Sequence, residues 1–301
     1  MDATTAPPRE RLKADGLLLA MTAIWGLTFV VVKDALARAD PFSWLALRFL
    51  IGAAVLTAVA RRGGGKASLK AGLILGTMLW LGFALQTVGL QYSTPSRSAF
   101  ITGTFVVLTP LVSTVLFRRL PRAPSLAGVA LAFAGTYWLS GAEPGSGAAP
   151  SSATVLGDLL TLGCALAYAV HLSLTEKYAA GSAPAALVAT QLWVSCALSA
   201  LAIPFGTPRL EPTPALLGAL LFTGVLASAL GFTAQTWAQA RTTAVRAALV
   251  IATEPIFATA YSVAAGRETV GAREVAGGSL ILLGVLVAEV GGMLWRRPPA
   301  G

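Results

Sequence analysis

The chain has 301 residues, of which 55% are hydrophobic and 12% are charged, and its formal net charge is +9. Soluble globular domains carry about 25% charged residues, so this composition excludes a soluble enzyme. It also excludes a disordered or collagen-like chain. The composition is typical of an all-α protein that crosses a membrane several times.

Ten apolar runs follow one another along the chain, each close to the roughly 20 residues that a helix needs to cross the hydrocarbon core. They cover residues 16–37, 42–60, 70–91, 98–117, 124–141, 155–176, 185–205, 214–236, 244–264 and 271–294. The run Leu73–Leu81 shows none of the alternation that marks an outer-membrane strand. We therefore predict ten transmembrane helices. The first run counts as one of them and not as a signal peptide, because it has a counterpart later in the chain.

Lysine and arginine are distributed unevenly between the connecting segments. With the N-terminus placed in the cytoplasm, 15 of these residues fall on the cytoplasmic side and 6 on the other, while Arg48 lies inside a predicted helix. Cytoplasmic segments of membrane proteins carry the excess of positive charge. We therefore expect both termini in the cytoplasm of a bacterial inner-membrane protein, and no nucleic-acid partner.

The second half of the chain repeats the first. A shift of 143 residues places Trp25 on Tyr168, and a shift of 149 residues places Gln86 on Gln235. Each half holds five predicted helices, an odd number, so the second half must cross the membrane in the opposite sense. Such inverted repeats are common in secondary transporters, which bind substrate near the midplane where the halves meet. We therefore expect a central cavity between the halves.

The repeat also sets the expected domain boundaries. These are a cytoplasmic tail at 1–15, a first five-helix repeat at 16–141, an external linker at 142–154, a second five-helix repeat at 155–295 and a cytoplasmic tail at 296–301. The linker is rich in Gly, Pro, Ala and Ser and lacks Lys and Arg, as a flexible external segment would be.

Several short motifs occur in a fixed order along the chain. They are Trp25-Gly26-Leu27-Thr28-Phe29, Arg48-Phe49, Leu90-Gln91-Tyr92-Ser93-Thr94, Pro110-Leu111, Thr253-Glu254-Pro255-Ile256-Phe257 and Gly266-Arg267-Glu268. In this order and spacing they resemble the drug/metabolite transporter superfamily, in the branch with two tandem EamA domains. The resemblance implies a ten-helix carrier whose cavity is lined by the first, third, fourth, sixth, eighth and ninth helices. It implies transport of small metabolites or drugs and does not name the substrate.

Two ionisable residues are predicted at membrane depth, where such groups are costly and often functional. Glu254 could carry a coupling proton or bind a substrate ammonium, or it could pair with an arginine or stabilise the kink at Pro255. Arg48 could anchor an anion or a buried carboxylate, or its side chain could snorkel to the interface. The sequence leaves these alternatives open.

Uncharged polar side chains provide further candidates. Gln86 and Gln235 are repeat mates, and an amide that both donates and accepts suits a polar, net-neutral substrate. The same amides could instead join helices in an apolar medium. Gln91 and Gln239 lie nearer to helix ends, so we expect both to be solvated. His171 could accept a proton near neutral pH or could be a hydrogen-bonded core residue.

Aromatic side chains on the expected lining helices are candidates for the cavity wall, where they would stack on planar groups or hold cations. These candidates are Trp25, Trp80, Tyr92, Phe100, Tyr168, Phe232 and Trp237. The alternative for each is contact with lipid or with the membrane interface. The repeat match between Trp25 and Tyr168 favours the cavity for these two.

These features favour a secondary carrier that moves amino-acid-like or other small polar or aromatic metabolites by alternating access, with export as the expected direction. A multidrug or cation efflux carrier of the same fold is the alternative. An intramembrane enzyme would need more than the pair Glu254 and His171, so we expect no catalytic activity. A non-transporting scaffold would need a large soluble domain.

Partners and cofactors follow from the same features. The sequence contains no phosphate-binding loop and no cysteine or histidine cluster, so we expect no cofactor and no metal. The expected partners are a small-molecule substrate, the lipid bilayer and a coupling proton. Ten helices can enclose a cavity alone, so both a monomer and a homodimer stay open.

Overall fold

Helices occupy all ten of the predicted ranges in the computed structural model, which describes residues 8–117, 123–140, 151–242 and 244–294. The first half contains α1 Pro8–Ala35, α2 Pro41–Gly63, α3 Leu69–Gln91, α4 Pro95–Gly103, α5 Phe105–Phe117 and α6 Ala123–Ser140. The second half contains α7 Ser152–Ala179, α8 Pro184–Ala202, α9 Pro214–Leu221, α10 Gly231–Gln239, α11 Ala244–Ile251, α12 Glu254–Ala264 and α13 Ala272–Leu294. A short 3-10 turn, η2 Ile203–Phe205, follows α8, and a π-helical stretch, η3 Phe222–Leu230, joins α9 to α10.

Seven of the described helical segments are long and apolar enough to cross a membrane. They are Leu12–Ala35, Pro41–Gly63, Leu69–Gln91, Pro95–Leu116, Ser152–Ala179, Pro184–Phe205 and Pro214–Gln239. The apolar helix Leu126–Trp138 is shorter, and α11 and α12 are short pieces of one predicted helix. The all-α, multi-pass fold class is confirmed, whereas the count of ten spans stays a prediction.

Two of the predicted helices are interrupted. The range 98–117 divides into α4 and α5 at Thr104, and the range 244–264 divides into α11 and α12 at 252–253. Pro255 follows the second break and has no N–H to donate to the carbonyl of Ile251, so the helix cannot continue regularly through this point. The two interrupted helices are repeat mates. Broken helices at membrane depth are tolerated where they lie against a cavity.

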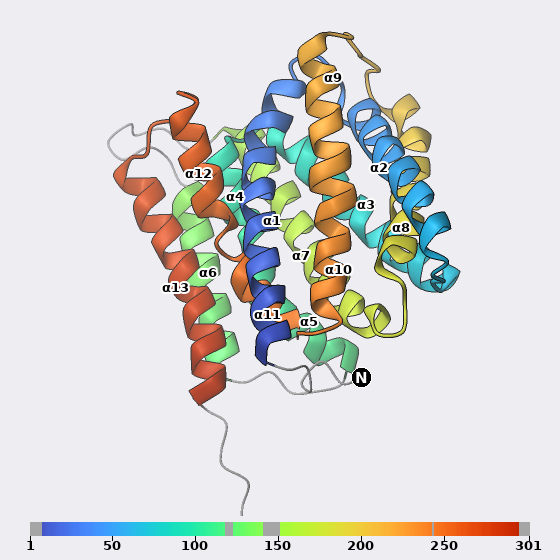
Figure 1. The fold of residues 1–301 in the computed structure, drawn as a ribbon. Helices are drawn as coiled ribbons and strands as arrows, with labels where there is room; N and C mark the ends of the chain where they lie inside the picture. The colour runs from blue at the N-terminus through green and yellow to red at the C-terminus, as the bar shows by residue number, and fades with distance from the viewer. Residues whose placement is uncertain (1–7, 118–122, 141–150, 243, 295–301) are drawn as a thin grey trace, which may run out of the picture.

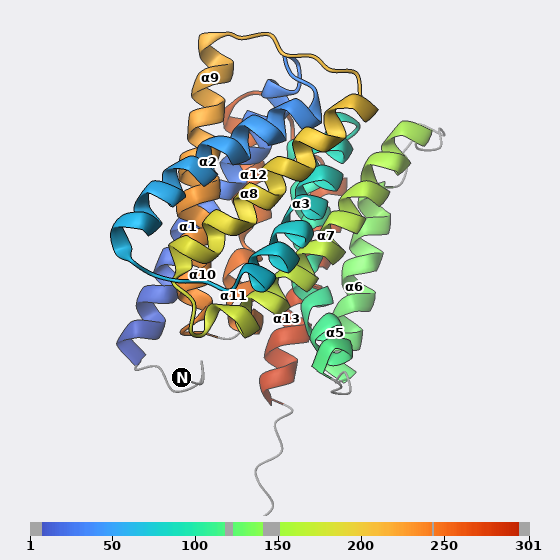
Figure 2. The ribbon, with the colours of Figure 1, turned by 90° about the vertical axis from the view of Figure 1, so that its right-hand side faces the viewer.

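The two halves pack against each other as a twofold relation requires. Helix α6 packs along α13 and α2 packs along α8, so each of these pairs joins a helix to its own repeat mate. Helix α1 packs on α12 and α10, and its mate α7 packs correspondingly on α4, α5 and α3. Helix α1 begins and α13 ends at the same end of the bundle (Figure 1), and α1 and α7 run in opposite directions (Figure 2).

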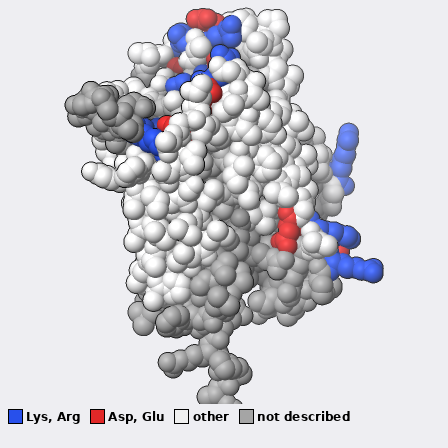
Figure 3. All heavy atoms as spheres, turned by 90° about the vertical axis from the view of Figure 1, so that its left-hand side faces the viewer, with Lys and Arg blue, Asp and Glu red and all other residues white. Residues whose placement is uncertain are grey.

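The face of the molecule drawn in Figure 3 is largely uncharged between the two ends of the bundle. In the view of Figure 3, charged side chains gather at the top and at the lower right, and a broad uncharged area lies across the middle. This distribution agrees with a protein whose middle lies in hydrocarbon and whose ends meet water.

A buried carboxylate holds the start of α2 in place. Asp40 accepts hydrogen bonds from the backbone N–H groups of Phe42 (3.1 Å) and Ser43 (3.0 Å), which caps the helix, and from the N–H of Arg209 (2.9 Å). Burial on its own raises the pKa of Asp40, but hydrogen bonds from Ser43, Arg209 and Phe42 outweigh burial and hold the pKa below its usual value. The carboxylate therefore ties the α1–α2 connection to the segment before α9.

Glycines let α6 and α13 approach closely. A Cβ atom added to Gly284 would lie 2.6 Å from the carbonyl oxygen of Gly128, and one added to Gly135 would lie 2.6 Å from that of Gly277. The two contacts are equivalent, because a shift of 149 residues relates Gly128 to Gly277 and Gly135 to Gly284. Small residues thus allow backbone-to-backbone packing at this helix pair.

Gly284→Ala is expected to lower the melting temperature of the protein, because the added methyl group meets backbone atoms that cannot rotate away. We expect a loss of about 1–3 kcal/mol in the free energy of unfolding. Gly218→Ala is the matched control, since a Cβ added there meets no atom within 4 Å and alanine favours a helix over glycine. Thermal unfolding in detergent measures both variants, and equal melting temperatures would contradict the close packing of α6 on α13.

Candidate functional site

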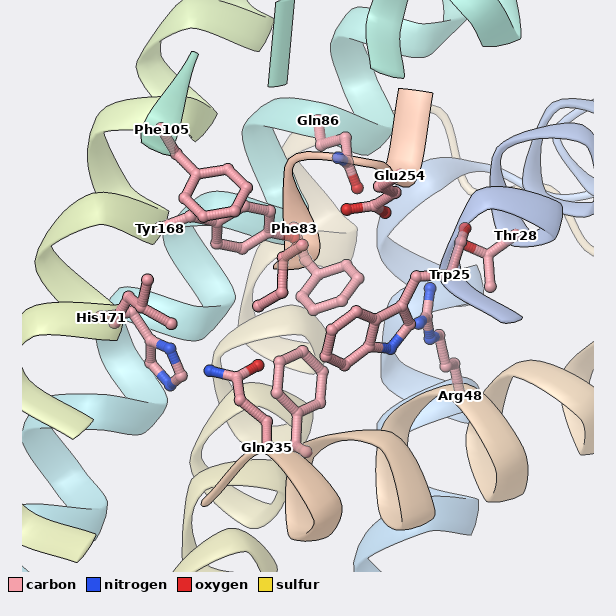
Figure 4. Close-up of a pocket in the computed structure, with 13 residues that line it drawn as sticks. Trp25, Thr28, Arg48, Phe83, Gln86, Phe105, Tyr168, His171, Gln235 and Glu254 are labelled. Carbon is pink, nitrogen blue, oxygen red and sulfur yellow. The ribbon is translucent and has the colours of Figure 1, made fainter. Parts of the chain in front are cut away.

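A cavity lies between the two halves and beside both helix breaks (Figure 4). Its lining side chains come from α1, α2, α3, α5, α7, α10, α11 and α12. They are Trp25, Thr28, Arg48, Phe83, Gln86, Phe105, Tyr168, His171, Leu172, Phe232, Gln235, Ile251 and Glu254. The cavity volume is about 60 Å³, room for a few water molecules at roughly 10–15 Å³ each. Side chains or helices must therefore move to admit a metabolite.

Aromatic rings form much of the wall. The ring centroids of Trp25 and Phe232 are 5.5 Å apart, those of Phe83 and Phe232 5.9 Å, and those of Phe83 and Tyr168 5.7 Å. The last two pairs meet edge to face, an arrangement that aromatic rings prefer. The indole N–H of Trp25 donates to the carbonyl of Ala227 (2.8 Å) within the π-helical stretch. This bond fixes the indole against the wall.

Arg48 reaches the cavity from α2, and its side chain does not snorkel, since only 2% of the residue is exposed. Its Nε donates to the hydroxyl of Ser228 (2.9 Å), and its guanidinium lies 4.5 Å from the centroid of the Phe83 ring. The terminal Nη2 is buried and has no hydrogen-bond partner. No carboxylate in the described part of the chain pairs with it, so the guanidinium is a buried cation without a counter-ion.

Glu254 is the first residue of α12, directly after the second helix break. A helix N-terminus favours a negative charge, and the break lets the side chain enter the cavity. Figure 4 shows its carboxyl pointing toward Gln86. Among the described residues, no arginine and no hydrogen-bond donor is paired with this carboxyl. The repeat mate Thr109 is buried and donates to the carbonyl of Phe105 (2.8 Å), so only one half supplies a carboxyl here.

The amide and imidazole side chains at the cavity have partners inside the protein. The Nε2 of Gln86 donates to the hydroxyl of Thr102 (3.1 Å), and the Nε2 of His171 lies 2.8 Å from the Oε1 of Gln191. The Nε2 of Gln235 donates to Gln239 (2.9 Å). Gln86 and His171 therefore line the cavity and also join helices, whereas the bond of Gln235 stays within α10.

Four of the residues predicted to line this cavity lie outside its lining. Trp80 is partly buried and packs against the core of the bundle. Tyr92 is the C-terminal capping residue of α3 and is 42% exposed. Phe100 packs against Ile281, and its ring would lie 2.6 Å from a Cβ atom added to Gly278 of α13. Trp237 stacks on the guanidinium of Arg241, 3.9 Å from the ring centroid. Trp237 is two residues after Gln235, and helical residues two apart point in nearly opposite directions. For these residues the sequence indicated the helix but not which face of that helix points toward the cavity.

Five lining residues were not among the candidates. They are Thr28, Phe83, Phe105, Leu172 and Ile251. Two of these could have been found by helical spacing, because Thr28 follows Trp25 by three residues and Phe83 precedes Gln86 by three. Phe105 and Ile251 flank the helix breaks, which the apolar runs did not reveal. Gln239, predicted to be solvated, is buried with 1% exposed, so that prediction was wrong.

A polar network ties α1 to α3, α4 and α12 at one end of the bundle. The Nζ of Lys33 donates to the carbonyls of Leu90 (2.7 Å) and Ser93 (2.8 Å) at the end of α3. Arg267 forms an ion pair with Asp34 (2.7 Å). Glu268 accepts from the hydroxyls of Ser96 and Ser262. Lys33, Asp34, Ser93, Arg267 and Glu268 are among the residues that line a second pocket, of about 750 Å³.

An ion pair also joins the halves directly. Arg97 of α4 donates through Nε to Oδ1 of Asp158 on α7 (2.8 Å) and through its terminal nitrogen to Oδ2 (2.5 Å). Such two-pronged pairs fix geometry as well as charge. The pair holds α4, before the first helix break, against α7.

Comparisons with known proteins agree with this architecture. The model of the family described as "EamA-like transporter family" matches residues 12–141 and 155–289. An "Uncharacterized transporter" of Archaeoglobus fulgidus is 33% identical over 284 residues, covering 93% of this chain and 87% of the relative. "Uncharacterized transporter YyaM" of Bacillus subtilis is 25% identical over 293 residues, covering 91% of this chain and 92% of the relative.

A solved structure titled "Crystal structure of protein" shares the fold, with a TM-score of 0.72 and 21% identity, covering 95% of this chain and 99% of that one. Two consecutive family matches divide the chain as the internal repeat does, and they confirm the resemblance that the short motifs indicated. The chain belongs to the EamA-like transporter family.

Proposed function

We propose that this protein is a secondary carrier of zwitterionic, amino-acid-like metabolites that bear an aromatic or apolar group. One observation carries the proposal. Arg48 and Glu254 line the same aromatic-walled cavity, and among the described residues neither has an opposite charge paired with it. A cavity with one unpaired cation and one unpaired carboxyl fits a molecule that brings the complementary charges.

The energetics of buried charge support this substrate class. An unpaired ion removed from water costs several kcal/mol, and a partner of opposite charge recovers much of that cost. A substrate carboxylate at Arg48 and a substrate ammonium at Glu254 would provide both partners at once. The rings of Trp25, Phe83 and Phe232 would then surround the substrate side chain, where stacking and apolar contact add affinity.

Transport would follow from the architecture. Ten helices in two inverted five-helix repeats would rock about the cavity and expose it to each side in turn. The helix breaks at Thr104 and 252–253 adjoin the cavity and could act as hinges. We place the protein in a bacterial inner membrane with both termini in the cytoplasm, acting as an exporter and not as an enzyme. Glu254 would release the coupling proton when it binds the ammonium.

Efflux of drugs or organic cations is the second candidate function. The carboxyl of Glu254 and the aromatic walls would suit a cation, and a cation needs no carboxylate. Arg48 argues against this candidate, because its guanidinium would repel a cation in the same small cavity. The two functions therefore differ in what they require of the ligand.

A thermal-shift comparison of three related ligands tests the proposal. Phenylalanine carries both charges, phenethylamine only the ammonium, and 3-phenylpropanoate only the carboxylate. We expect phenylalanine to stabilise the purified protein most, by about 2.7 kcal/mol at one hundred times its dissociation constant. Stabilisation by phenethylamine alone would favour cation efflux. If the protein neither binds any of the three ligands nor transports any of them into proteoliposomes, the proposed substrate class is wrong.

A further inference from the structure

A directed chain of hydrogen bonds runs behind one wall of the cavity. Gln235 and Gln239 are one helical turn apart on α10, and both are buried. The Nε2 of Gln235 donates to the Oε1 of Gln239 (2.9 Å), and the Nε2 of Gln239 donates to the backbone carbonyl of Leu172 on α7 (3.0 Å). Of the two glutamines, only Gln235 lines the cavity.

The chemistry of the last acceptor fixes the direction of this chain. A backbone carbonyl can only accept a hydrogen bond, so Gln239 must turn its NH₂ group toward Leu172 and its oxygen toward Gln235. Gln235 must then turn its own NH₂ group toward Gln239. Side-chain amides have nearly the same shape in either orientation, yet here only one orientation satisfies both bonds. Figure 4 shows the resulting arrangement, with the nitrogen of Gln235 on the side of His171 and its oxygen on the side of Trp25.

The repeat mate of Gln235 has no such restraint. Gln86 contacts the hydroxyl of Thr102 (3.1 Å), and a hydroxyl can donate or accept, so either orientation of the Gln86 amide satisfies that bond. The residue one turn after Gln86 is Leu90, in the place that Gln239 takes in the second half. The hydrogen bonds among the described residues therefore fix the amide of Gln235, whereas the bond to Thr102 does not fix that of Gln86.

Two other neutral donors at the cavity are already used within the protein. The indole N–H of Trp25 donates to the carbonyl of Ala227 (2.8 Å), and the hydroxyl of Thr28 donates to the carbonyl of Trp25 (2.7 Å). These two side chains therefore have no N–H or O–H left to donate to a substrate beside the oxygen of Gln235.

We propose that Gln239 is a positioning residue that holds the amide oxygen of Gln235 toward the cavity, so that this wall selects substrates that donate a hydrogen bond there. The selected group is an N–H of an ammonium, an amide or a heteroaromatic ring. The selectivity rests on the proposed function of the cavity as the substrate site, whereas the fixed orientation of Gln235 does not.

The orientation can be tested without any ligand. The chain has five glutamines, at positions 86, 91, 191, 235 and 239, so protein labelled with ¹⁵N only in glutamine side chains gives five amide signals that single substitutions can assign. In Gln239→Met, which keeps the length of the side chain, the Gln235 protons should exchange with water about fivefold faster, the change expected from one lost hydrogen bond. Gln239→Glu keeps an oxygen facing Gln235 and should preserve slow exchange. Unchanged exchange in Gln239→Met would overturn the positioning role.

Indole and benzofuran test the selectivity, because they share a shape while only indole has an N–H to donate. We expect the wild-type protein and Gln239→Glu to bind indole about fivefold more tightly than benzofuran, and Gln239→Met to bind the two equally. A preference that persists in Gln239→Met but disappears in Gln235→Met would overturn the role of Gln239 and leave the cavity as the site. If Gln235→Met leaves the affinities for indole and benzofuran unchanged, the proposed selectivity is wrong, and the result counts against the cavity as the substrate site. The exchange measurement still decides the orientation of the Gln235 amide.

Discussion

Arg48→Met is expected to abolish the advantage of phenylalanine over phenethylamine while the protein stays folded. The guanidinium is the only cation that lines the cavity in the described structure, so it alone can hold a substrate carboxylate there. We expect the affinity for phenylalanine to fall about 10- to 100-fold, the range for a hydrogen bond to a charged group. Methionine fills similar space and makes favourable contact with the ring of Phe83. Isothermal titration in detergent measures both ligands.

The melting temperature of Arg48→Met should equal or exceed that of the wild type, because removing a buried charge that has no counter-ion is often stabilising. Arg48→Lys is the companion variant. It keeps the charge but loses the flat stacking on Phe83 and the geometry of the bond to Ser228, so it should bind phenylalanine with intermediate affinity. Wild-type affinity in Arg48→Met would show that the carboxylate binds elsewhere or that the substrate has none.

Glu254→Gln is expected to remove the response of transport to a pH gradient. Glutamine keeps the shape of the side chain but cannot gain or lose a proton, so a carrier that couples through Glu254 would lose its driving force. Exchange of labelled for unlabelled substrate across proteoliposomes needs no net proton movement and should continue, but at higher substrate concentrations, because the substrate ammonium loses its carboxylate partner. We expect uptake with a pH gradient to fall to the level measured without one.

Glu211→Gln provides the matched control for this experiment. Glu211 lies in the segment before α9, and its side chain is 58% exposed, so losing its charge should leave coupled uptake unchanged. A wild-type response to the pH gradient in Glu254→Gln would rule out Glu254 as the proton carrier. Loss of both coupled uptake and exchange at saturating substrate would show that the substrate ammonium cannot bind without the Glu254 carboxylate.

The sequence was sufficient for the architecture because membrane crossing imposes simple requirements. Apolar length located the helices, and prolines, glutamines and arginines that recur at fixed shifts revealed the repeat. A kink at Pro255 was expected from the proline, but the interruption at Thr104 was not predicted, since the run 98–117 has no proline beside that residue. A break depends on which backbone groups find partners in the bundle, and that information is tertiary.

Where the repeat supplied a second indication, the candidate residues lie at the cavity. Trp25, Tyr168, Gln86 and Gln235 are repeat mates in two pairs, and all four line the cavity. Trp80, Tyr92, Phe100 and Trp237 were chosen for their chemistry and their helix alone, and none of them lines the cavity. The burial of Gln239 could not be predicted from its place near the end of an apolar run, because the carbonyl that it meets belongs to α7.

The inexact repeat has a consequence for how a molecule can sit in the cavity. Two identical halves would create a site with a twofold axis, in which any substrate could bind in two opposed and equally stable ways. Here the mate of Arg48 is Gln191 and the mate of Glu254 is Thr109, so the positive and negative ends come from different halves. A molecule whose two ends carry different charges then has a single lowest-energy orientation in the cavity. It presents the same end first each time the carrier opens to a given side.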